Sequence, residues 1–177
     1  MRAIYSSSRA KGFTLVEIMI VVAIIALIAA IAIPNLLRAR HNANETAAIG
    51  NLRTLVDGLE EFRSNMAPTS YPGAGVTVGL GGPAATSLAD LAVLNPPYFD
   101  TVLGSGTRQG YTFTYVPNGQ RNVVIAGNNF TVYDGYTILA RPITLNITGT
   151  RRFFVDQSGV IRANATADAT ANDVPLE

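Results

Sequence analysis

The feature that most limits how this chain can fold is an apolar segment near its N-terminus, without a polar residue from Ile18 to Ile33. Counted from Phe13, the segment has roughly twenty residues, enough to cross the hydrocarbon core of a bilayer as a helix. One carboxylate, Glu17, lies near its start. A charged side chain at membrane depth costs free energy, so it usually has a partner and a function. The sequence therefore predicts a helix buried in a membrane or in an assembly, with one functional acid.

The residues at the start of this segment carry a family resemblance. The run Lys11–Glu17 reads Lys-Gly-Phe-Thr-Leu-Val-Glu, and it resembles the processing site of type IV pilins and of type II secretion pseudopilins. The resemblance is specific to the motif from Lys11 to about Pro34 and extends to the architecture beyond it. It implies that a prepilin peptidase cuts the chain between Gly12 and Phe13 and that Phe13 is then methylated on its α-amine. Residues 1–12 would be a cytoplasmic leader, absent from the mature protein.

Two other interpretations of the N-terminal segment remain open. An ordinary secretory signal has a basic region, an apolar region and a small-residue cleavage site, and a cut near Ala29-Ala30 or Ala32 would fit that pattern. Against it, the apolar segment is longer than such a region usually is, and Glu17 interrupts it near its start. The segment could also be a plain membrane anchor. The basic residues that precede it place the leader on the cytoplasmic side.

Composition fits a single exported domain with little charge. Charged residues make up 14% of the chain and hydrophobic residues 48%, and the length is near the common domain size. The formal net charge is +1, but Arg2, Arg9 and Lys11 belong to the leader, and their loss leaves ten basic against twelve acidic side chains, a charge of −2. A nearly neutral chain offers no electrostatic case for nucleic-acid binding.

The chain has no cysteine, which excludes disulfides, cysteine–metal sites and thiol chemistry. Many members of the pilin family close a C-terminal loop with a disulfide, so this chain departs from that pattern. Its C-terminal loop must be held by packing and hydrogen bonds instead.

Glu17 is the expected partner of the mature N-terminus. Lys11 is the only lysine, so after cleavage the α-amino group of Phe13 is the only amine of the protein. An amine in a low-dielectric environment needs a counter-charge, and Glu17 is the only acid of the apolar segment. Glu17 lies about one helical turn from Phe13, so the pair could form within one subunit or between two. The resemblance implies pairing with the Phe13 amine of a neighbouring subunit; the alternative is a Glu17 solvated or protonated near the headgroups.

Helical periodicity resumes after Pro34, which directly follows the apolar run. Apolar residues recur at spacings of three and four, which predicts an amphipathic helix with one buried face: Ile49, Leu52, Leu55, Val56, Leu59, Phe62 and Met66. We therefore expect one long helix over 13–65, kinked at Pro34 because proline removes a backbone hydrogen bond. Residues 13–33 would lie in the membrane or in a filament core, and residues 34–65 would form a stem on a globular head. Alternatively, Pro34 begins a separate helix after a true break.

Residues 66–177 form the predicted head, in which glycine and proline first mark an irregular connection. A short helix is expected at 87–94. Alternating patterns then predict strands at 111–115, 121–126, 136–141, 152–155 and 160–162, with turns at Asn118-Gly119 and at 156–159. The small polar tail from Asn164 is expected to be mobile. Together with the long helix, this predicts an α+β fold with an antiparallel sheet packed on the helix, which is also the architecture that the resemblance implies.

No set of residues points to catalysis or to a cofactor. His41 is the only histidine and lies in the stem, where we expect a solvated or interface residue. No glycine-rich stretch continues into a phosphate-binding loop or a dinucleotide fingerprint. Four acids could offer oxygen ligands to calcium, but their spacing fits no EF-hand loop: Asp134, Asp156, Asp168 and Asp173. We therefore predict no catalytic residue, no cofactor and no metal site, and a protein that is not an enzyme.

The resemblance implies a structural subunit of a type IV pilus filament, which assembles through its N-terminal helix. The implied partners are identical subunits, the prepilin peptidase, the inner-membrane assembly machinery and, before assembly, membrane lipid. The implied location is the bacterial inner membrane, crossed once with the N-terminus in the cytoplasm, and afterwards a periplasmic or extracellular filament. A pseudopilin of a type II secretion system shares this stem and is the first alternative. The second is a monomeric membrane-anchored binding module, whose head acts and whose helix only tethers.

Overall fold

The structure of the protein is a computed structural model that describes residues 12–78 and 83–176. The chain divides into two compact units, residues 1–39 and 40–177. The boundary falls inside the first helix, so that the helical residues 40–65 belong to the same unit as the sheet. The predicted leader lies outside the described residues, except for Gly12.

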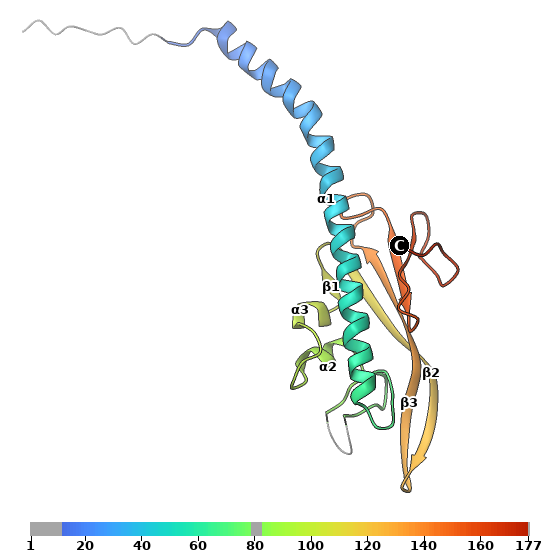
Figure 1. Cartoon of the computed structure of the whole chain (residues 1–177). Coiled ribbons are helices and arrows are strands. Elements are labelled where there is room, and N and C mark those ends of the chain that lie inside the picture. Colours follow the sequence, from blue (N-terminus) through green and yellow to red (C-terminus); the bar gives the residue numbers. More distant parts are fainter. Residues whose placement is uncertain (1–11, 79–82, 177) are drawn as a thin grey trace, which may run out of the picture. The chain divides into compact units, whose positions relative to one another are not determined.

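The helix α1 (Leu15–Asn65) runs without a break through Pro34 (Figure 1). The long N-terminal helix predicted from the sequence is confirmed, and the alternative of two separate helices is not what the structure shows. Pro34 has no backbone N–H, so one hydrogen bond of the helix is missing there. A kink at this position remains a prediction.

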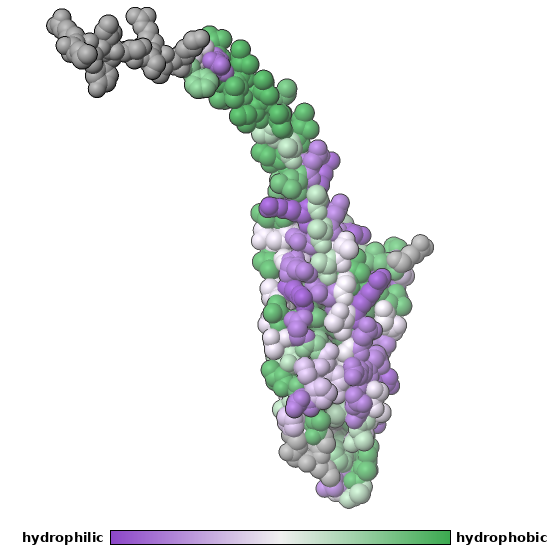
Figure 2. All heavy atoms as spheres, turned by 60° about the vertical axis from the view of Figure 1, so that its left-hand side comes forward, coloured by the Kyte–Doolittle hydropathy of each residue, from purple (hydrophilic) through white to green (hydrophobic). Residues whose placement is uncertain are grey.

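In the first unit, the apolar side chains of α1 are exposed on every side. Ile24, Ile25, Leu27 and Ile28 point in different directions around the helix, yet each is more than half exposed. Figure 2 shows this part of α1 as an almost uniformly hydrophobic surface. Among the described residues, α1 is also the helix that is long and apolar enough to cross a membrane. Such a surface needs lipid or other apolar helices to cover it.

The second unit is built on a five-stranded sheet whose strands lie in sequence order (Figure 1). The strands are β1 (Thr107–Arg108), β2 (Tyr111–Ile125), β3 (Asn128–Pro142), β4 (Arg152–Asp156) and β5 (Arg162–Asn164). Each strand pairs with the next in antiparallel fashion. The predicted α+β fold with an antiparallel sheet is therefore confirmed.

The core of the second unit lies between the stem part of α1 and one face of the sheet. The apolar face predicted for the stem is buried without exposed surface at four positions: Leu52, Leu55, Leu59 and Phe62. These side chains form one cluster with buried residues of the strands, among them Tyr111, Tyr136, Ile138, Ala140 and Phe153. The stem is thus an integral part of the core and covers the sheet.

Two short helices, α2 (Leu88–Val93) and α3 (Thr101–Gly104), come between α1 and the sheet in the chain. The first of them confirms the helix predicted at 87–94. Ser87 caps it by accepting a hydrogen bond from the Asp90 N–H, and the Asp90 carboxylate accepts one from the Ser87 N–H in return. This reciprocal capping box satisfies two backbone donors that a helix end would otherwise leave free.

The hairpin predicted at Asn118-Gly119 is wrong. Gly119 has a positive φ of 67°, but β2 runs through it and keeps one register with β3 on both sides. The turn lies at Ala126-Gly127, where φ values of 52° and 81° suit a two-residue turn of type I′. An asparagine–glycine pair signals left-handed backbone, which here distorts a strand locally instead of ending it. The strand predicted at 121–126 is the end of β2, except for Ala126, which lies in the turn, and the strand predicted at 136–141 is part of β3.

The tail from Asn164, expected to be mobile, is instead folded back on the sheet. Arg162 pairs with Pro175 in an isolated β-bridge, and Asn164 donates a hydrogen bond of 2.8 Å to the Asp173 carboxylate. Ala169 is buried. Polar turns and one small buried residue leave no hydrophobic pattern in a sequence. The composition of the tail was therefore the only signal, and it is typical of a mobile segment. Hydrogen bonds and packing hold this segment, in agreement with the absence of cysteine.

Candidate functional site

The predicted processing junction precedes the first helix. Gly12, Phe13 and Thr14 lie outside α1 and are exposed, so the peptide bond between Gly12 and Phe13 is accessible in this structure. A β-carbon added at Gly12 would meet no atom within 4 Å. The fold therefore does not require glycine at this position, and any requirement for it must come from an enzyme that acts on the junction.

Thr14 caps the first helix. Its hydroxyl oxygen accepts a hydrogen bond of 3.2 Å from the Glu17 N–H, and its carbonyl accepts one from the Ile18 N–H. This is the arrangement of an N-cap residue, which satisfies a donor at the helix start. This role of Thr14 was not predicted, although the Thr-x-x-Glu spacing in the sequence is a known signal for it. The cap explains why α1 begins at Leu15 and not at Phe13.

Glu17 lies in the first turn of α1, with its side chain exposed beside the apolar surface. A carboxylate in the first turn is favourable because the N-terminal end of a helix carries a partial positive charge. Among residues 12–78 and 83–176, no ion pair involves Glu17. The structure thus brings Glu17 and Phe13 to the same end of the helix, while pairing with a neighbouring subunit remains a prediction.

A second acid of α1, Glu45, has a structural role that was not predicted from the sequence. It is only 4% exposed, and its carboxylate accepts four hydrogen bonds from the segment before β4. Two come from the backbone N–H and hydroxyl of Thr150, both at 2.8 Å, and two from the backbone N–H and Nε of Arg151, at 3.1 and 2.7 Å. Burial raises the pKa of the Glu45 carboxyl, but these hydrogen bonds outweigh burial, so the pKa lies below its usual value.

Glu45 and its neighbours fasten the loop of residues 143–151, between β3 and β4, to the stem. Asn44 donates a hydrogen bond of 2.8 Å to the Thr148 carbonyl. Tyr111 donates one of 2.8 Å to the Arg151 carbonyl, and a β-carbon at Gly149 would lie 2.1 Å from the Tyr111 hydroxyl. The sequence separation from Glu45 to Thr150 is 105 residues, so no local pattern could have predicted these contacts. The loop is therefore held at the N-terminal end of the stem.

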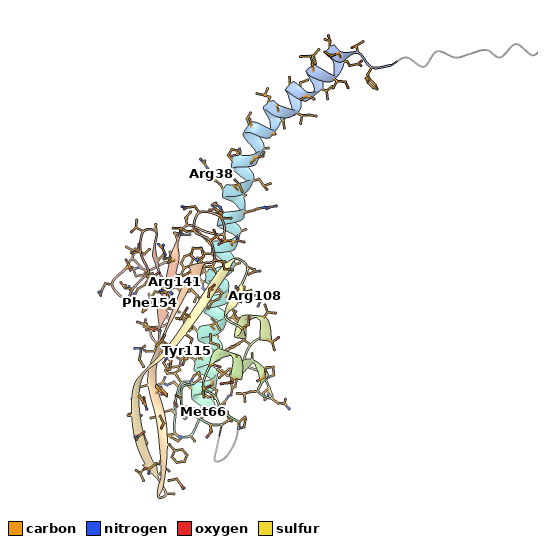
Figure 3. The ribbon with its side chains drawn as sticks, turned by 180° about the vertical axis from the view of Figure 1, so that it is seen from behind. Arg38, Met66, Arg108, Tyr115, Arg141 and Phe154 are labelled. Atoms are coloured by element: carbon orange, nitrogen blue, oxygen red, sulfur yellow. The ribbon has the colours of Figure 1, made fainter. Side chains whose placement is uncertain are left out.

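The four acids considered as possible calcium ligands have other partners. Each carboxylate accepts a hydrogen bond from a nearby side chain: Asp134 from Arg121, Asp156 from Ser158, Asp168 from Arg141 and Asp173 from Asn164. Within the described part of the chain, no three histidine, cysteine or acidic side chains come together to hold a metal ion. Arg141 lies beside Phe154 on the outer face of the sheet (Figure 3). There its two hydrogen bonds to Asp168, at 2.8 and 2.7 Å, fasten the C-terminal segment.

His41 is half-buried in the stem. Its Nε2 atom is buried and has no hydrogen-bond partner among the described residues. Its side chain lies on α1 one turn before Glu45, in a position that the second unit covers in part. Nothing around it forms a nucleophile or a relay with it in the described part of the chain.

Comparison with known proteins identifies the N-terminal segment. Residues 7–33 match the family model of the prokaryotic N-terminal methylation motif. The matched range includes the Gly12-Phe13 junction, the Thr14 cap, Glu17 and the exposed apolar part of α1. No solved structure matches the chain.

Curated relatives match longer stretches of the chain than the family model does. The chain is 47% identical to the type IV wide pilus major component PilA4 of Thermus thermophilus over 72 residues, which are 40% of this chain and 55% of that protein. It is 44% identical to the type IV major pilin protein PilA of Myxococcus xanthus over 64 residues, 36% of this chain and 29% of that protein. It is 31% identical to the type II secretion system core protein G of Aeromonas hydrophila over 67 residues, 37% of this chain and 47% of that protein.

These matches span about half the length of the relatives or less, so they do not cover the whole of any of them. The family model agrees with the geometry in one respect: its matched residues, 7–33, include the exposed apolar part of α1 and the motif that precedes it. In this N-terminal segment, the chain carries the prokaryotic N-terminal methylation motif and is similar to type IV pilins and to type II secretion core proteins.

Proposed function

We propose that this chain is a structural subunit of a type IV pilus, which polymerises through its N-terminal helix once the leader is removed between Gly12 and Phe13. The observation that carries the proposal is the surface of α1 in the first unit, which is apolar on every side and exposed. Burial of such a surface lowers the free energy by roughly 0.8 kcal/mol per methylene group. Identical helices packed side by side in a filament core provide that burial without lipid.

Glu17 is the proposed contact between subunits. It is the only acid between Phe13 and Arg38, and after cleavage the Phe13 α-amine is the only amine of the chain. In a core of low dielectric constant, each charge alone would be unfavourable, whereas the two together form a favourable pair. Methylation of the amine leaves its positive charge in place, so the proposed N-methylation of Phe13 is compatible with this pairing. Because the Glu17 side chain is exposed, the N-terminus of a neighbouring subunit can reach it.

We propose that the protein passes through two stages, membrane insertion with removal of the leader and then assembly into a filament. It first crosses the bacterial inner membrane once, with residues 1–12 in the cytoplasm, where a prepilin peptidase removes them. The inner-membrane assembly machinery then transfers the helix from lipid into a filament of identical subunits. The exposed Gly12-Phe13 bond supports the first stage, and the uncovered apolar surface of α1 supports both.

A pseudopilin of a type II secretion system is the second candidate, because the relatives include core protein G of such systems. Two observations favour the pilus. The pilin relatives are 47% and 44% identical to this chain, against 31% for core protein G of Aeromonas hydrophila. Major pseudopilins of the family commonly hold calcium in a C-terminal loop, whereas Asp168 and Asp173 here accept hydrogen bonds from Arg141 and Asn164.

Intact-mass analysis of protein sheared from the cell surface tests the proposal. We expect filaments in electron micrographs of this fraction, and a mass equal to residues 13–177 with one added methyl group. Protein that keeps residues 1–12 and stays with the membranes would instead favour a monomeric anchored module. A chain that starts near Ala30 would indicate an ordinary secretory signal and overturn the proposal.

A further inference from the structure

The face of the sheet that is turned away from the stem carries apolar side chains. Side chains of a strand alternate between the two faces, and the register brings Thr114, Leu139 and Phe154 of β2, β3 and β4 into one row. Val116 and Thr137 form the next row. Val116 is 51% exposed, and Leu139 and Phe154 are half-buried. An antiparallel sheet usually presents polar side chains to water, so this apolar surface is unusual and suits a partner.

The C-terminal segment turns this face of the sheet into a groove. Residues 168–172 and the sheet together line a cavity of about 580 Å³, and Arg141, labelled in Figure 3, is one of its lining residues. Clefts that hold a ligand measure roughly 300–1,000 Å³. The hydrogen bonds between Arg141 and Asp168 fasten the segment to β3, and the Asp173 carboxylate accepts two more from Thr170, at 2.6 and 2.9 Å. The groove is therefore already formed before anything binds in it.

The loop that Glu45 holds carries a second exposed apolar surface. Three aliphatic side chains alternate along it and are exposed, and we call them the loop triad: Ile143 at 55%, Leu145 at 43% and Ile147 at 64%. Together they form a patch, unlike single exposed apolar residues, which are common on any surface. The hydrogen bonds from Asn44 to the Thr148 carbonyl and from Thr150 to Glu45 hold this loop on the stem. The loop triad is therefore a fixed feature of the second unit.

The loop triad and the groove match in charge and lie at different places of the second unit. Residues 142–150 contain no charged residue, and the two charged side chains among the described residues that line the groove, Arg141 and Asp168, are paired with each other. Contact between the two surfaces therefore buries no unpaired charge. Among the described residues, none of 143–149 lines the groove, and the loop is bonded to the stem, which covers the opposite face of the sheet. A loop held in this way is available to the groove of another copy.

We propose that the loop triad of one subunit binds in the groove of the next subunit. The occupant of the groove is thus a second copy of the chain, and the contact is heterologous, because it joins two different surfaces. Such a contact leaves a free loop on one copy and a free groove on the other, so it repeats from copy to copy and gives an open filament unless the row closes into a ring. It adds a contact between second units to the proposed packing of the apolar helices. The inference rests on the proposed filament of identical subunits.

Pairs of introduced cysteines can test this contact, because the native chain contains no cysteine. The double variant Ile147→Cys/Val116→Cys places one cysteine in the loop triad and one in the groove, both at exposed positions. Leu145→Cys/Val116→Cys is a second pair of the same design. Ile147→Cys/Val124→Cys is the matched control, because Val124 is an exposed valine of the same strand as Val116. The two valines are separated along β2 by roughly 26 Å at a rise of 3.3 Å per residue.

Filaments sheared from cells that express each full-length variant are treated with copper phenanthroline, which oxidises neighbouring thiols to disulfides, and are then denatured and separated on a non-reducing gel. In a heterologous contact, each subunit is linked to one neighbour through its loop cysteine and to another through its groove cysteine. We therefore expect both loop–groove pairs to give a ladder of dimers, trimers and longer chains, which a reductant converts to monomer. The control and each single-cysteine variant should remain monomeric.

The gel separates failure of the inference from failure of the proposed function. Native chain that forms no filaments overturns the proposed function and the inference with it. Native filaments together with monomeric bands from both loop–groove pairs overturn the contact while the filament stands. Dimers from Ile147→Cys alone assign the loop to a contact with its own copy in a neighbour, and an equal ladder from the control shows that any exposed cysteines become linked; both results contradict the inference.

A second arrangement applies if the double variants do not assemble. Ile147→Cys and Val116→Cys are then expressed together as separate chains, so that each subunit carries one cysteine. We expect dimers that contain one chain of each kind, and no longer species, because each subunit can form one disulfide. Filaments of this mixture that give only monomers overturn the contact.

Discussion

Replacement of Glu45 by alanine is the mutation whose cost the structure defines best. The carboxylate is buried and accepts four hydrogen bonds, one of them in an ion pair of 2.7 Å with Arg151. Loss of one partner of a buried ion pair costs about 3–5 kcal/mol. The Arg151 side chain is 41% exposed, so water can solvate its guanidinium group after the mutation. We therefore expect a loss at the lower end, about 3 kcal/mol of unfolding free energy.

For a unit of this size, a loss of about 3 kcal/mol corresponds to a decrease in melting temperature of about 10 °C. Near-ultraviolet circular dichroism of the buried tyrosines Tyr71, Tyr111 and Tyr136 follows the second unit without interference from the apolar part of α1. Glu61→Gln is the matched control, because Glu61 is an exposed glutamate of the same helix. Its effect should remain within about 0.5 kcal/mol. Equal melting temperatures for Glu45→Ala and Glu61→Gln would refute the argument that Glu45 fastens the loop.

Hydrogen bonds lower the pKa of the Glu45 carboxyl in the folded state, so this group stabilises the fold above its ordinary pKa of 4.5 and the stabilisation is lost as the pH falls below that value. The difference in unfolding free energy between the native chain and Glu45→Gln should therefore become smaller at acid pH. Chemical denaturation at a series of pH values measures this difference. Gly12→Leu should leave the leader attached in mass spectra yet leave the melting temperature unchanged, since a side chain at residue 12 meets no atom; a cleaved product would contradict this. A fragment of residues 40–177 should be soluble and unfold cooperatively, whereas one that begins at Pro68 lacks the stem and should aggregate; a soluble, cooperative Pro68 fragment would show that the stem is not part of the core.

The helical part of the fold could be predicted because its signals are local. An apolar run without a polar residue from Ile18 to Ile33 and a stem with apolar residues at spacings of three and four both predict a helix. The buried positions Leu52, Leu55, Leu59 and Phe62 are those that the pattern placed on one face. The short helix after Ser87 was predictable for the same reason. Residues 13–33 were expected to be covered by lipid or by other helices, and the structure leaves them exposed.

The strand boundaries were harder to predict. Residues typical of turns indicate a left-handed backbone conformation, but they do not show whether the chain reverses its direction there. The Asn118-Gly119 pair and the Ala126-Gly127 pair both contain left-handed backbone, but only the second reverses the chain. Alanine at the first position of the true turn is an unusual choice, since a residue with a β-carbon is strained there. The sequence therefore favoured the wrong pair, although the strands on either side were recognised.

The contacts that fix the loop and the tail could not be predicted at all. Glu45 meets Thr150 and Arg151 across more than a hundred residues, and Arg141 meets Asp168 across 27. Charged residues in a sequence are usually solvated, so nothing marks those that will be buried or paired. The N-cap role of Thr14 is different, because its spacing from Glu17 was available in the sequence.

In the proposed filament, Glu17 joins subunits through the processed N-terminus of a neighbour. The amount of filament recovered by shearing from cells that express Glu17→Ala or Glu17→Gln, seen by electron microscopy and compared with the native chain, tests it most directly. Glu17→Gln keeps the size and hydrogen bonding of the side chain but removes its charge. The cap at Thr14 uses the backbone N–H of residue 17, so the helix start should persist in both variants.

Removal of the carboxylate eases insertion into lipid, because a charge at membrane depth is unfavourable. Immunoblots of the membrane fraction should therefore find both variants at native levels. We predict that Glu17→Ala and Glu17→Gln both lose most of their filaments, whereas Glu61→Gln keeps them. Native filament abundance in Glu17→Gln together with a loss in Glu17→Ala would assign Glu17 a packing role, and native abundance in both variants would contradict assembly through this charge.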